Sequence, residues 1–244
     1  MRRFGLIGHP LGHSFSKTYF TEKFQREGLD CRYDNFDLDD LSELPYLIKQ
    51  NPDLKGFNVT APYKEAILPY LIGWADPVTE IQAVNTVRVL DGGMLLGFNT
   101  DVMGLEQTGC FEKPAMTAGT KALVFGTGGV SKAVQYVLRK HQIDYHLVSR
   151  TTSQGDYTFD LLTPLIIGEH RLLINATPVG TFPRIDEALP IPYEAITPDH
   201  VMLDLIYNPE ETRFLQEGKK RGASVLNGLK MLHAQAEASW KIWE

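Results

Sequence analysis

Small polar side chains follow the short apolar runs in the first half of this 244-residue chain. They supply hydroxyls, amides, one cation and one anion: Ser14, Ser16, Asn58, Thr60, Lys64, Asn85, Thr86, Asn99 and Asp101. If the apolar runs are strands of an open α/β sheet, these groups stand at strand ends, and ligands bind outside the carboxyl ends of such strands. The combination suits a small polyhydroxylated carboxylate.

Each of these residues also has a purely structural interpretation. Asn, Asp, Ser and Thr at strand ends commonly form turns and helix caps, and a lone Lys soon after Pro62 is commonly solvated. That interpretation does not explain why four separate strand ends carry such groups together, so we favour a ligand site. We interpret His9 and His13 as residues that structure their loop.

Lys64 and Asp101 are the cation and the anion of this set, and the pair suits proton transfer. When a hydride reaches a carbonyl carbon, negative charge grows on the oxygen, and a cation or proton donor within hydrogen-bond reach lowers that barrier. We therefore expect Lys64 to be the donor and Asp101 to orient it. The sequence has no metal-like spacing of ligands, so we expect no metal.

A glycine-rich turn at residues 126–129 separates a predicted strand, 122–125, from a predicted helix, 132–141. Such a turn can bring backbone N–H groups and a helix N-terminus up to a pyrophosphate. Ser131 replaces the third glycine of the usual Gly-x-Gly-x-x-Gly pattern. Taken alone, the turn is equally compatible with a plain strand-to-helix connection.

The end of the next predicted strand, 145–148, indicates which dinucleotide would bind there. NAD-binding turns place Asp or Glu about 20 residues after the glycines to bond the ribose hydroxyls. Here the strand is followed by Ser149, Arg150 and Thr151. A carboxylate would repel a 2′-phosphate, whereas Arg150 can pair with it, so we predict NADP(H). The alternative is that Arg150 is an ordinary surface cation.

Apolar runs and their spacing predict two α/β units joined near residues 101–121. We expect strands at 4–7, 32–36, 55–60, 122–125, 145–148, 172–175, 201–205 and 223–226, and a hairpin formed by 83–90 and 94–98. We expect helices at 17–27, 40–50 with an interruption near Pro45, 62–70 with Pro62 in the first turn, 102–108, 132–141 and 229–243.

Composition narrows the class of protein. A formal net charge of -6 disfavours nucleic acid as a partner. The two cysteines, Cys31 and Cys110, are far apart and indicate reduced thiols in a cytoplasmic protein. The first apolar run is too short for a signal peptide, and no run approaches a membrane span. We expect no membrane partner and a small-molecule substrate.

The motifs together resemble the shikimate dehydrogenase family. They run in the family's order across nearly the whole chain: Gly8-x-Pro10-x-x-His13-Ser14-x-Ser16, Gly56-Phe57-Asn58-Val59-Thr60-x-Pro62-x-Lys64, Ala83-Val84-Asn85-Thr86, Gly97-x-Asn99-Thr100-Asp101, Gly126-x-Gly128-Gly129, Asn175-Ala176-Thr177-Pro178, Asp204-x-x-Tyr207 and Gly228-x-x-Met231-x-x-x-Gln235.

The resemblance implies an α/β fold with an N-terminal substrate domain, residues 1–101 with the helix 229–244, and a C-terminal Rossmann-like NADP-binding domain, residues 102–228, with a cleft between them. It implies reversible NADPH-dependent reduction of 3-dehydroshikimate to shikimate, a step in aromatic amino acid biosynthesis. A homodimer is left open.

The resemblance also assigns roles by position. Lys64 and Asp101 would be the catalytic pair. The substrate would be held by Ser14, Ser16 and Tyr207 at its carboxylate and by Thr60, Asn85 and Gln235 at its ring hydroxyls. The cofactor would be held by Gly126, Gly128, Gly129, Ser149, Arg150, Thr151, Thr177, Gly228 and Met231.

Several positions depart from the family pattern. Lys17, Tyr63 and Ser149 stand where the family usually has Pro, Phe and Asn, and Gln154 stands where a second Arg is frequent. The segment 151–174 is short, so we expect one βα unit there to be reduced or missing. Two alternatives remain. One is an enzyme of the same fold that acts on quinate or on an aminated shikimate analogue. The other is a regulatory binding protein without turnover, and the presence of Lys64 and Asp101 disfavours this second alternative.

Overall fold

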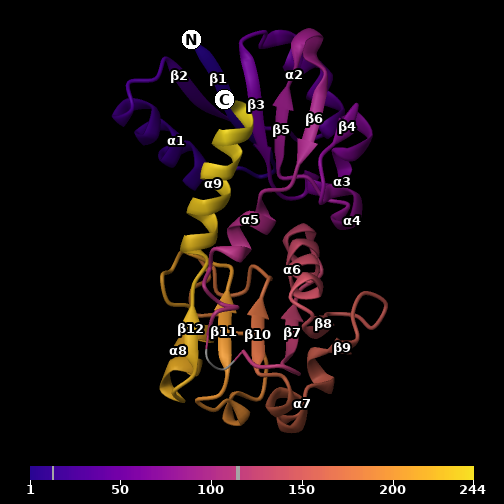
Figure 1. The fold of residues 1–244 in the computed structure, drawn as a ribbon, viewed down its shortest axis with the longest axis vertical. Coiled ribbons are helices and arrows are strands. Elements are labelled where there is room, and N and C mark those ends of the chain that lie inside the picture. Colours follow the sequence, from indigo (N-terminus) through magenta and orange to yellow (C-terminus); the bar gives the residue numbers. More distant parts are fainter. Residues whose placement is uncertain (13, 114–115) are drawn as a thin grey trace. The chain divides into compact units, whose positions relative to one another are not determined.

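The computed structural model of the chain describes residues 1–12, 14–113 and 116–244; His13, which we had interpreted as a loop-structuring residue, lies outside this part. Contacts within the chain divide it into two compact units; Figure 1 labels their helices and strands and colours the chain along its sequence. The first unit contains Met1–Thr100 and Ala236–Glu244, and the second contains Asp101–Gln235.

The first unit is built on a mixed sheet with strand order β2-β1-β3-β5-β6-β4. Its strands are β1 (Arg2–Gly8), β2 (Cys31–Asp37), β3 (Leu54–Val59), β4 (Gly73–Trp74), β5 (Thr86–Val89) and β6 (Leu95–Phe98). Its helices are α1 (Phe15–Arg26), α2 (Leu44–Gln50), α3 (Tyr63–Ala66) and α4 (Val78–Ile81). β1 pairs in parallel with β2 and β3, and the antiparallel β5–β6 pair confirms the predicted hairpin.

Three expected helices have different limits in the structure, and the sequence explains each. α1 begins at Phe15 rather than at residue 17 because the Ser14 hydroxyl accepts the backbone N–H of Lys17 at 3.3 Å. The helix expected over 40–50 is interrupted close to Pro45, as predicted: a 3-10 turn covers Leu41–Glu43 and α2 begins at Leu44, with the proline in its first turn, where no N–H is needed. The helix expected from Pro62 to residue 70 does begin at Pro62, its N-cap, but is split, since Pro69 ends α3 early and a 3-10 turn follows.

An aromatic cluster ties the end of the chain to the first unit's sheet. It consists of Phe4, Phe20, Phe24, Tyr33, Trp240 and Trp243, all buried. Trp243 stacks on Phe4 with ring centroids 5.1 Å apart. Its indole lies directly over Gly56 of β3, where a Cβ would approach the ring within 2.3 Å, so only glycine fits there. The last helix is thereby part of this unit's core.

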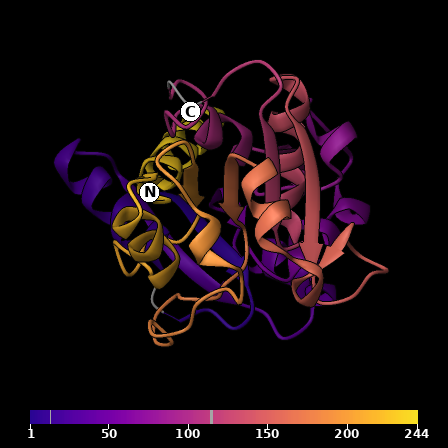
Figure 2. The same ribbon diagram turned by 90° about the horizontal axis from the view of Figure 1, so that it is seen from below.

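The second unit is a wholly parallel sheet with strand order β12-β11-β10-β7-β8-β9. Its strands, orange to salmon in Figure 2, are β7 (Lys121–Phe125), β8 (Asp144–Ser149), β9 (Tyr157–Thr158), β10 (Leu172–Asn175), β11 (Val201–Asp204) and β12 (Ser224–Leu226). Its helices are α5 (Asp101–Glu106), α6 (Gly129–Lys140), α7 (Pro164–Glu169), α8 (Arg213–Lys220) and the part of α9 (Leu229–Trp243) that ends at Gln235.

Parallel strands alternating with helices confirm the predicted α/β class. The central strands β7, β10 and β11 are almost continuously apolar and buried, as parallel strands covered on both faces must be. The short segment 151–174 contains a reduced unit, a two-residue β9 and a six-residue α7, rather than none. Among the described residues, no helix has the length and apolar character to cross a bilayer.

Candidate active site

The loop after β1 carries the two serines predicted to hold a carboxylate, and Asp37 fixes its course. The Asp37 carboxylate accepts the backbone N–H of Leu11 at 3.0 Å and lies 2.8 Å from His9 Nδ1. These contacts hold the pKa of Asp37 below its ordinary value, the Leu11 amide being the larger cause. Both serines are half-buried; Ser14 caps α1, and Ser16 hydrogen-bonds the Tyr33 hydroxyl.

The end of β3 leads directly to Thr60 and Lys64. The Thr60 amide bonds the carbonyl of Ile7 at 2.9 Å, which continues the pairing of β3 with β1 beyond the strand. Lys64 lies half-buried on α3, and its carbonyl accepts the N–H of Val84 at 2.7 Å. The cation therefore stands on a short helix that is bonded to the segment leading into β5.

Asn85 and Thr86 at the start of β5 belong to a buried polar network. The Asn85 side-chain oxygen accepts the Thr100 N–H at 2.7 Å, and its amide nitrogen donates to Thr100 Oγ1 at 3.0 Å. Asn58 of β3 donates to the Asn85 carbonyl at 3.2 Å and to Thr86 Oγ1 at 3.1 Å. Four strand-end groups are thus joined, and Ser239 of α9 completes the network.

Sequence reasoning missed Ser239. It lies four residues after Gln235 on α9, and no motif singled it out. The signal that could have found it is the helical spacing, since positions i and i+4 share one helix face. Asp101, in contrast, was predicted; it is buried in the first turn of α5, where the N–H groups of a helix start favour a carboxylate.

The glycine-rich turn of the second unit has the form that a pyrophosphate requires. Gly126 has φ +103° and passes so close to Ala176 and Thr177 that a Cβ would meet both at 3.0 Å. Gly128 precedes α6, with open space where its Cβ would be. No side chain caps α6 and no acidic residue occupies its first turn, so its N–H groups remain available for an anion. The residues present fit a bound dinucleotide.

The end of β8 carries the residues predicted for the adenosine side, Ser149, Arg150 and Thr151. Ser149 is buried, and its hydroxyl donates to the Thr151 carbonyl and accepts the Thr151 N–H at 3.2 Å. Ser149 therefore forms the turn that presents its neighbour Arg150. The Arg150 side chain is exposed, and no carboxylate of the described residues forms an ion pair with it. A cation held out by a rigid turn suits a phosphate group.

Asn175 and Asp204 organise the loops that follow β10 and β11. Asn175 Oδ1 accepts the Thr177 hydroxyl at 2.7 Å, and its nitrogen donates to Asp204 at 3.1 Å. Asp204 also accepts the N–H of Ile206 at 3.0 Å and the Thr212 hydroxyl at 2.6 Å. Burial raises the pKa of Asp204 to about 6, against the lowering effect of these hydrogen bonds.

Close backbone packing fixes the start of α9, which carries Met231 and Gln235 and is preceded by Gly228. A Cβ on Gly228 would lie 2.2 Å from the Leu205 carbonyl oxygen, so the chain can pass there only as glycine. Met231 is buried beneath Gly104 of α5, where a Cβ would lie 2.6 Å from the Met231 carbonyl oxygen. Gln235 is buried and donates to the Leu232 carbonyl at 3.0 Å.

Tyr207 lies in the loop between β11 and α8 and is half-buried. Burial raises the pKa of its hydroxyl, which therefore stays protonated and can donate a hydrogen bond at neutral pH. Such a donor suits the carboxylate role predicted for it.

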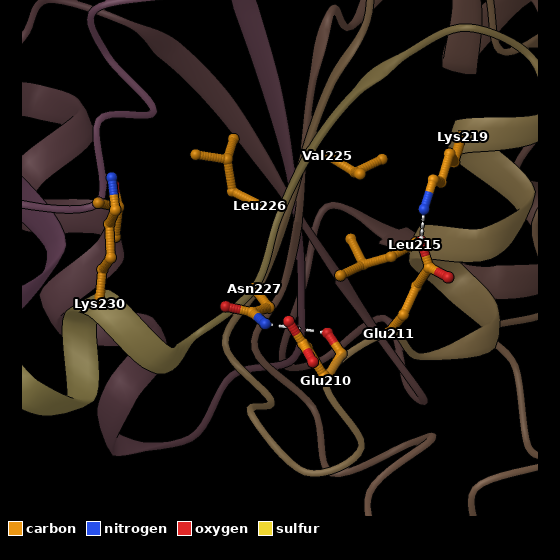
Figure 3. Close-up of a pocket in the computed structure, with 9 residues that line it drawn as sticks. Glu210, Glu211, Leu215, Lys219, Val225, Leu226, Asn227 and Lys230 are labelled. Carbon is orange, nitrogen blue, oxygen red and sulfur yellow. Dashed lines mark hydrogen bonds and ion pairs between the residues drawn. The ribbon is translucent and has the colours of Figure 1, made fainter.

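A separate hollow of about 550 Å³ lies beside β12 and α8 in the second unit (Figure 3). Its charged groups include the Lys219–Glu211 pair, 2.7 Å apart, with Lys230 on the other side of the apolar floor. None of the predicted substrate or cofactor residues lines it. In the described part of the chain, no cluster of His, Cys, Asp and Glu could hold a metal ion.

Comparisons with known proteins agree with this geometry. A family model described as the shikimate dehydrogenase substrate binding domain matches residues 6–87. The shikimate dehydrogenase (NADP(+)) of Methanococcus maripaludis is 34% identical over 255 residues, which cover 98% of this chain and 90% of that protein.

Two solved structures have the same fold as this chain and differ in how similar their sequences are to it. The Thermus thermophilus shikimate 5-dehydrogenase in complex with NADP(H) and shikimate is 33% identical, with a TM-score of 0.86 over 100% of this chain and 93% of that one. The quinate dehydrogenase of Corynebacterium glutamicum in complex with NAD is 26% identical, with a TM-score of 0.86 over 99% and 93%. Because curated relatives above 30% identity span nearly the whole chain, it belongs to the shikimate dehydrogenase family.

Proposed function

We propose that this chain catalyses the reversible NADPH-dependent reduction of 3-dehydroshikimate to shikimate, in aromatic amino acid biosynthesis. The observation that carries the proposal is a combination of two features in one chain: polar side chains at the strand ends of the first unit, and a glycine-rich turn that leads into α6, whose N-terminus no side chain caps. The curated relatives of this chain are named shikimate dehydrogenase (NADP(+)). A carbonyl reduction needs both parts, a binding surface for the polyol and a place for the dinucleotide.

Lys64 and Asp101 carry the proton chemistry in this proposal. When bound, NADPH supplies the hydride. The Lys64 ammonium donates a hydrogen bond to the carbonyl oxygen as negative charge grows there, and it transfers a proton to that oxygen, which thereby becomes the new hydroxyl. The Asp101 carboxylate accepts a hydrogen bond from that ammonium and from a neighbouring substrate hydroxyl, which fixes both groups. In the oxidative direction the neutral Lys64 amine takes the hydroxyl proton.

The remaining predicted residues divide between binding the two ligands. Ser14, Ser16 and Tyr207 hold the substrate carboxylate, and Thr60, Asn85 and Gln235 hold ring hydroxyls. Support comes from the half-buried hydroxyls of the serine loop and the fixed amide of Asn85. The backbone at Gly126, Gly128 and Gly129 receives the pyrophosphate, Arg150 the 2′-phosphate with Ser149 and Thr151 shaping its turn, and Thr177, Gly228 and Met231 border the nicotinamide.

We further propose that residues 1–101 with 229–244 form the substrate-binding and catalytic domain and that residues 102–228 form the NADP-binding domain. The match of residues 6–87 to a substrate-domain model supports the first, and the parallel sheet with its glycine turn supports the second. A cytoplasmic location agrees with two cysteines that form no disulfide. A homodimer is the assembly to test, by sedimentation of the purified chain.

The decisive experiment measures NADP⁺ reduction by the purified protein with shikimate, with quinate and NAD⁺ in matched assays. We expect turnover with shikimate and NADP⁺, and much lower kcat/KM for the other three combinations. Faster turnover with quinate would favour the activity named for the Corynebacterium glutamicum neighbour. No turnover with either acid, despite dinucleotide binding, would favour the regulatory alternative.

A further inference from the structure

Gly104 brings α5 into close contact with α9. A Cβ at Gly104 would lie 2.6 Å from the carbonyl oxygen of Met231, 2.9 Å from its Cγ and 3.3 Å from the Cβ of Gln235. All three residues are buried. The nearest of these atoms belongs to the backbone of a helix, which cannot turn away as the tip of a side chain can. The two helices therefore approach this closely only because residue 104 has no side chain.

The contact lies one helical turn from each of two predicted site residues. Asp101, the proposed catalytic carboxylate, precedes Gly104 by three positions on α5. Gln235, proposed to bind a ring hydroxyl, follows Met231 by four positions on α9. Residues three or four positions apart share one face of a helix. The face of α5 that carries Asp101 therefore meets the face of α9 that carries Gln235.

Asp101 and Gln235 also stand where the chain passes from one unit to the other. Asp101 is the first residue of the second unit, and Gln235 is its last. The contact at Gly104 thus joins the beginning and the end of this unit in one packed pair of helices. In the proposed function both side chains bind the same substrate molecule, so the distance between them has to match it.

Other contacts of α5 do not set its distance from α9. The N–H of Thr100, the residue before the helix, donates to the polar network of the first unit, which fixes where α5 begins but not the direction it takes. At the other end, Glu106 bonds Lys140 and His141, both at 2.8 Å. These partners belong to the end of α6 and not to α9. The approach of α5 to α9 is therefore set at Gly104, between these two anchors.

We propose that Gly104 is a positioning residue, which sets the spacing between the Asp101 carboxylate and the Gln235 amide and so aligns the proton-transfer group with the substrate. This inference rests on the proposed function, in which both side chains contact the substrate. A side chain at residue 104 would have to open the contact from 2.6 Å to at least 3.4 Å, where ordinary van der Waals distances begin. A misplacement of about 1 Å can lower a rate by about 10²-fold, so a shift of this size should be visible in kcat.

The test compares Gly104→Ala with Gly218→Ala in steady-state shikimate oxidation and in thermal unfolding. Gly218 is a buried glycine of α8 in the same unit, and a Cβ there would lie 2.2 Å from Met202 Sδ. Both variants should lower Tm, because each overpacks a helix contact. Only Gly104→Ala should lower kcat, by about tenfold, with the KM for NADP⁺ within about twofold of wild type.

A double-mutant comparison separates positioning from a general loss of packing. In an Asp101→Asn background, Gly104→Ala should change kcat by less than about twofold, because the carboxylate that it displaces is already absent. A further fall in kcat as large as that in the wild-type background would show that residue 104 acts independently of Asp101, and would overturn the inference.

The outcomes separate this inference from the proposed function. Absence of wild-type turnover with shikimate refutes the proposed function and the inference with it. Wild-type turnover with an unchanged kcat in Gly104→Ala overturns the inference alone, as does an equal fall in Gly218→Ala. If Gly104→Ala does not fold, Met231→Ile, which adds a branch on the α9 side of the same contact, is judged by the same criterion of a lowered kcat with an unchanged KM for NADP⁺.

Discussion

The two units of the molecule build their predicted ligand sites in opposite ways. In the first unit, side chains bond to side chains: Asn58, Asn85, Thr86, Thr100 and Ser239 form one buried network. In the second, the glycine turn and the uncapped start of α6 offer backbone N–H groups, while polar side chains bond to their own loops. The first site is specified by side-chain identity and the second by the course of the main chain.

The ligands explain this difference. A polyhydroxylated ring presents donors and acceptors at fixed positions, and a site with unmatched partners loses affinity steeply. A pyrophosphate presents only acceptors and charge, which any group of N–H donors at a helix start can satisfy. In the first unit, a substitution should therefore weaken ligand binding when it removes a hydrogen-bonding group of a side chain. In the second unit, it should weaken binding when it fills the space beside the backbone or changes the charge.

Lys64→Ala should give the largest effect, because it removes the one cation proposed to act on the reacting oxygen. We expect kcat to fall by about 10²–10⁴, the usual range for a positioned proton donor, with a much smaller change in the KM for shikimate. The measurement is steady-state oxidation of shikimate at saturating NADP⁺. Lys55→Ala, an exposed cation of β3, is the control and should behave as wild type. Near-normal turnover in Lys64→Ala would refute the assignment.

The Ser14→Ala, Ser16→Ala double variant tests whether hydroxyls of the first unit bind the carboxylate. Each lost charge-assisted hydrogen bond should cost about 1.5–3 kcal/mol of binding, seen mainly in the KM for shikimate because the carboxylate is remote from the hydride. Ser14 also caps α1, so some stability will be lost. Asp40→Ala, which removes another cap in the same unit, controls for this. An unchanged KM would contradict the role.

Arg150→Ala tests whether charge in the second unit selects the cofactor. Removing the exposed guanidinium should weaken NADP⁺ by about tenfold, the loss of one or two charge-assisted bonds to a phosphate, and leave NAD⁺ nearly unaffected. The ratio of kcat/KM values for the two cofactors is the measured quantity. Arg171→Ala, another exposed arginine of the same unit, should leave the ratio as in wild type. A wild type that uses both cofactors equally would show that this turn does not select for the 2′-phosphate.

Asp204 should give the smallest effect, visible in stability rather than in turnover. Burial raises its pKa from 3.8 to about 6 in the folded chain, so the folded state binds this proton more tightly than the unfolded state. The stabilisation is complete below pH 3.8 and disappears as pH rises through about 6. Thermal unfolding of wild type and Asp204→Asn from pH 4 to 7 should show wild type losing stability relative to the variant. A constant difference in Tm would contradict the raised pKa.

The sequence predicted the positions of the strands better than it predicted the hydrogen bonds between the site residues. Continuous apolar runs gave Leu172–Asn175 with the limits found, and the pattern of α9 gave residues 229–243 as its extent. α8 was missed because its strongly polar face hides the apolar pair Phe214 and Leu215. β9 escaped detection because two residues carry no periodic signal.

Within the site, the sequence identified residues without their partners. Spacing placed Asn58, Asn85 and Thr86 at strand ends, but pairing of β3 with β5 in antiparallel register is what brings their side chains together. The bond from α9 links residues 153 positions apart, which no local pattern encodes. Ser149 was expected to offer its hydroxyl to a ligand; the structure gives that hydroxyl to the Thr151 turn instead.

The return of α9 to the first unit has a consequence for the order of events during synthesis. Among the described elements the ribosome makes β1 before all others and α9 after all others, so Phe4, Phe20 and Phe24 stay without Trp240 and Trp243 until α9 has been made. The strands of the second unit have all been made by then. A chain stopped after Gln235 should therefore show protease-resistant residues 101–235 and a digestible N-terminal part, and equal resistance of both would contradict this. The first unit to be started is the last to be completed.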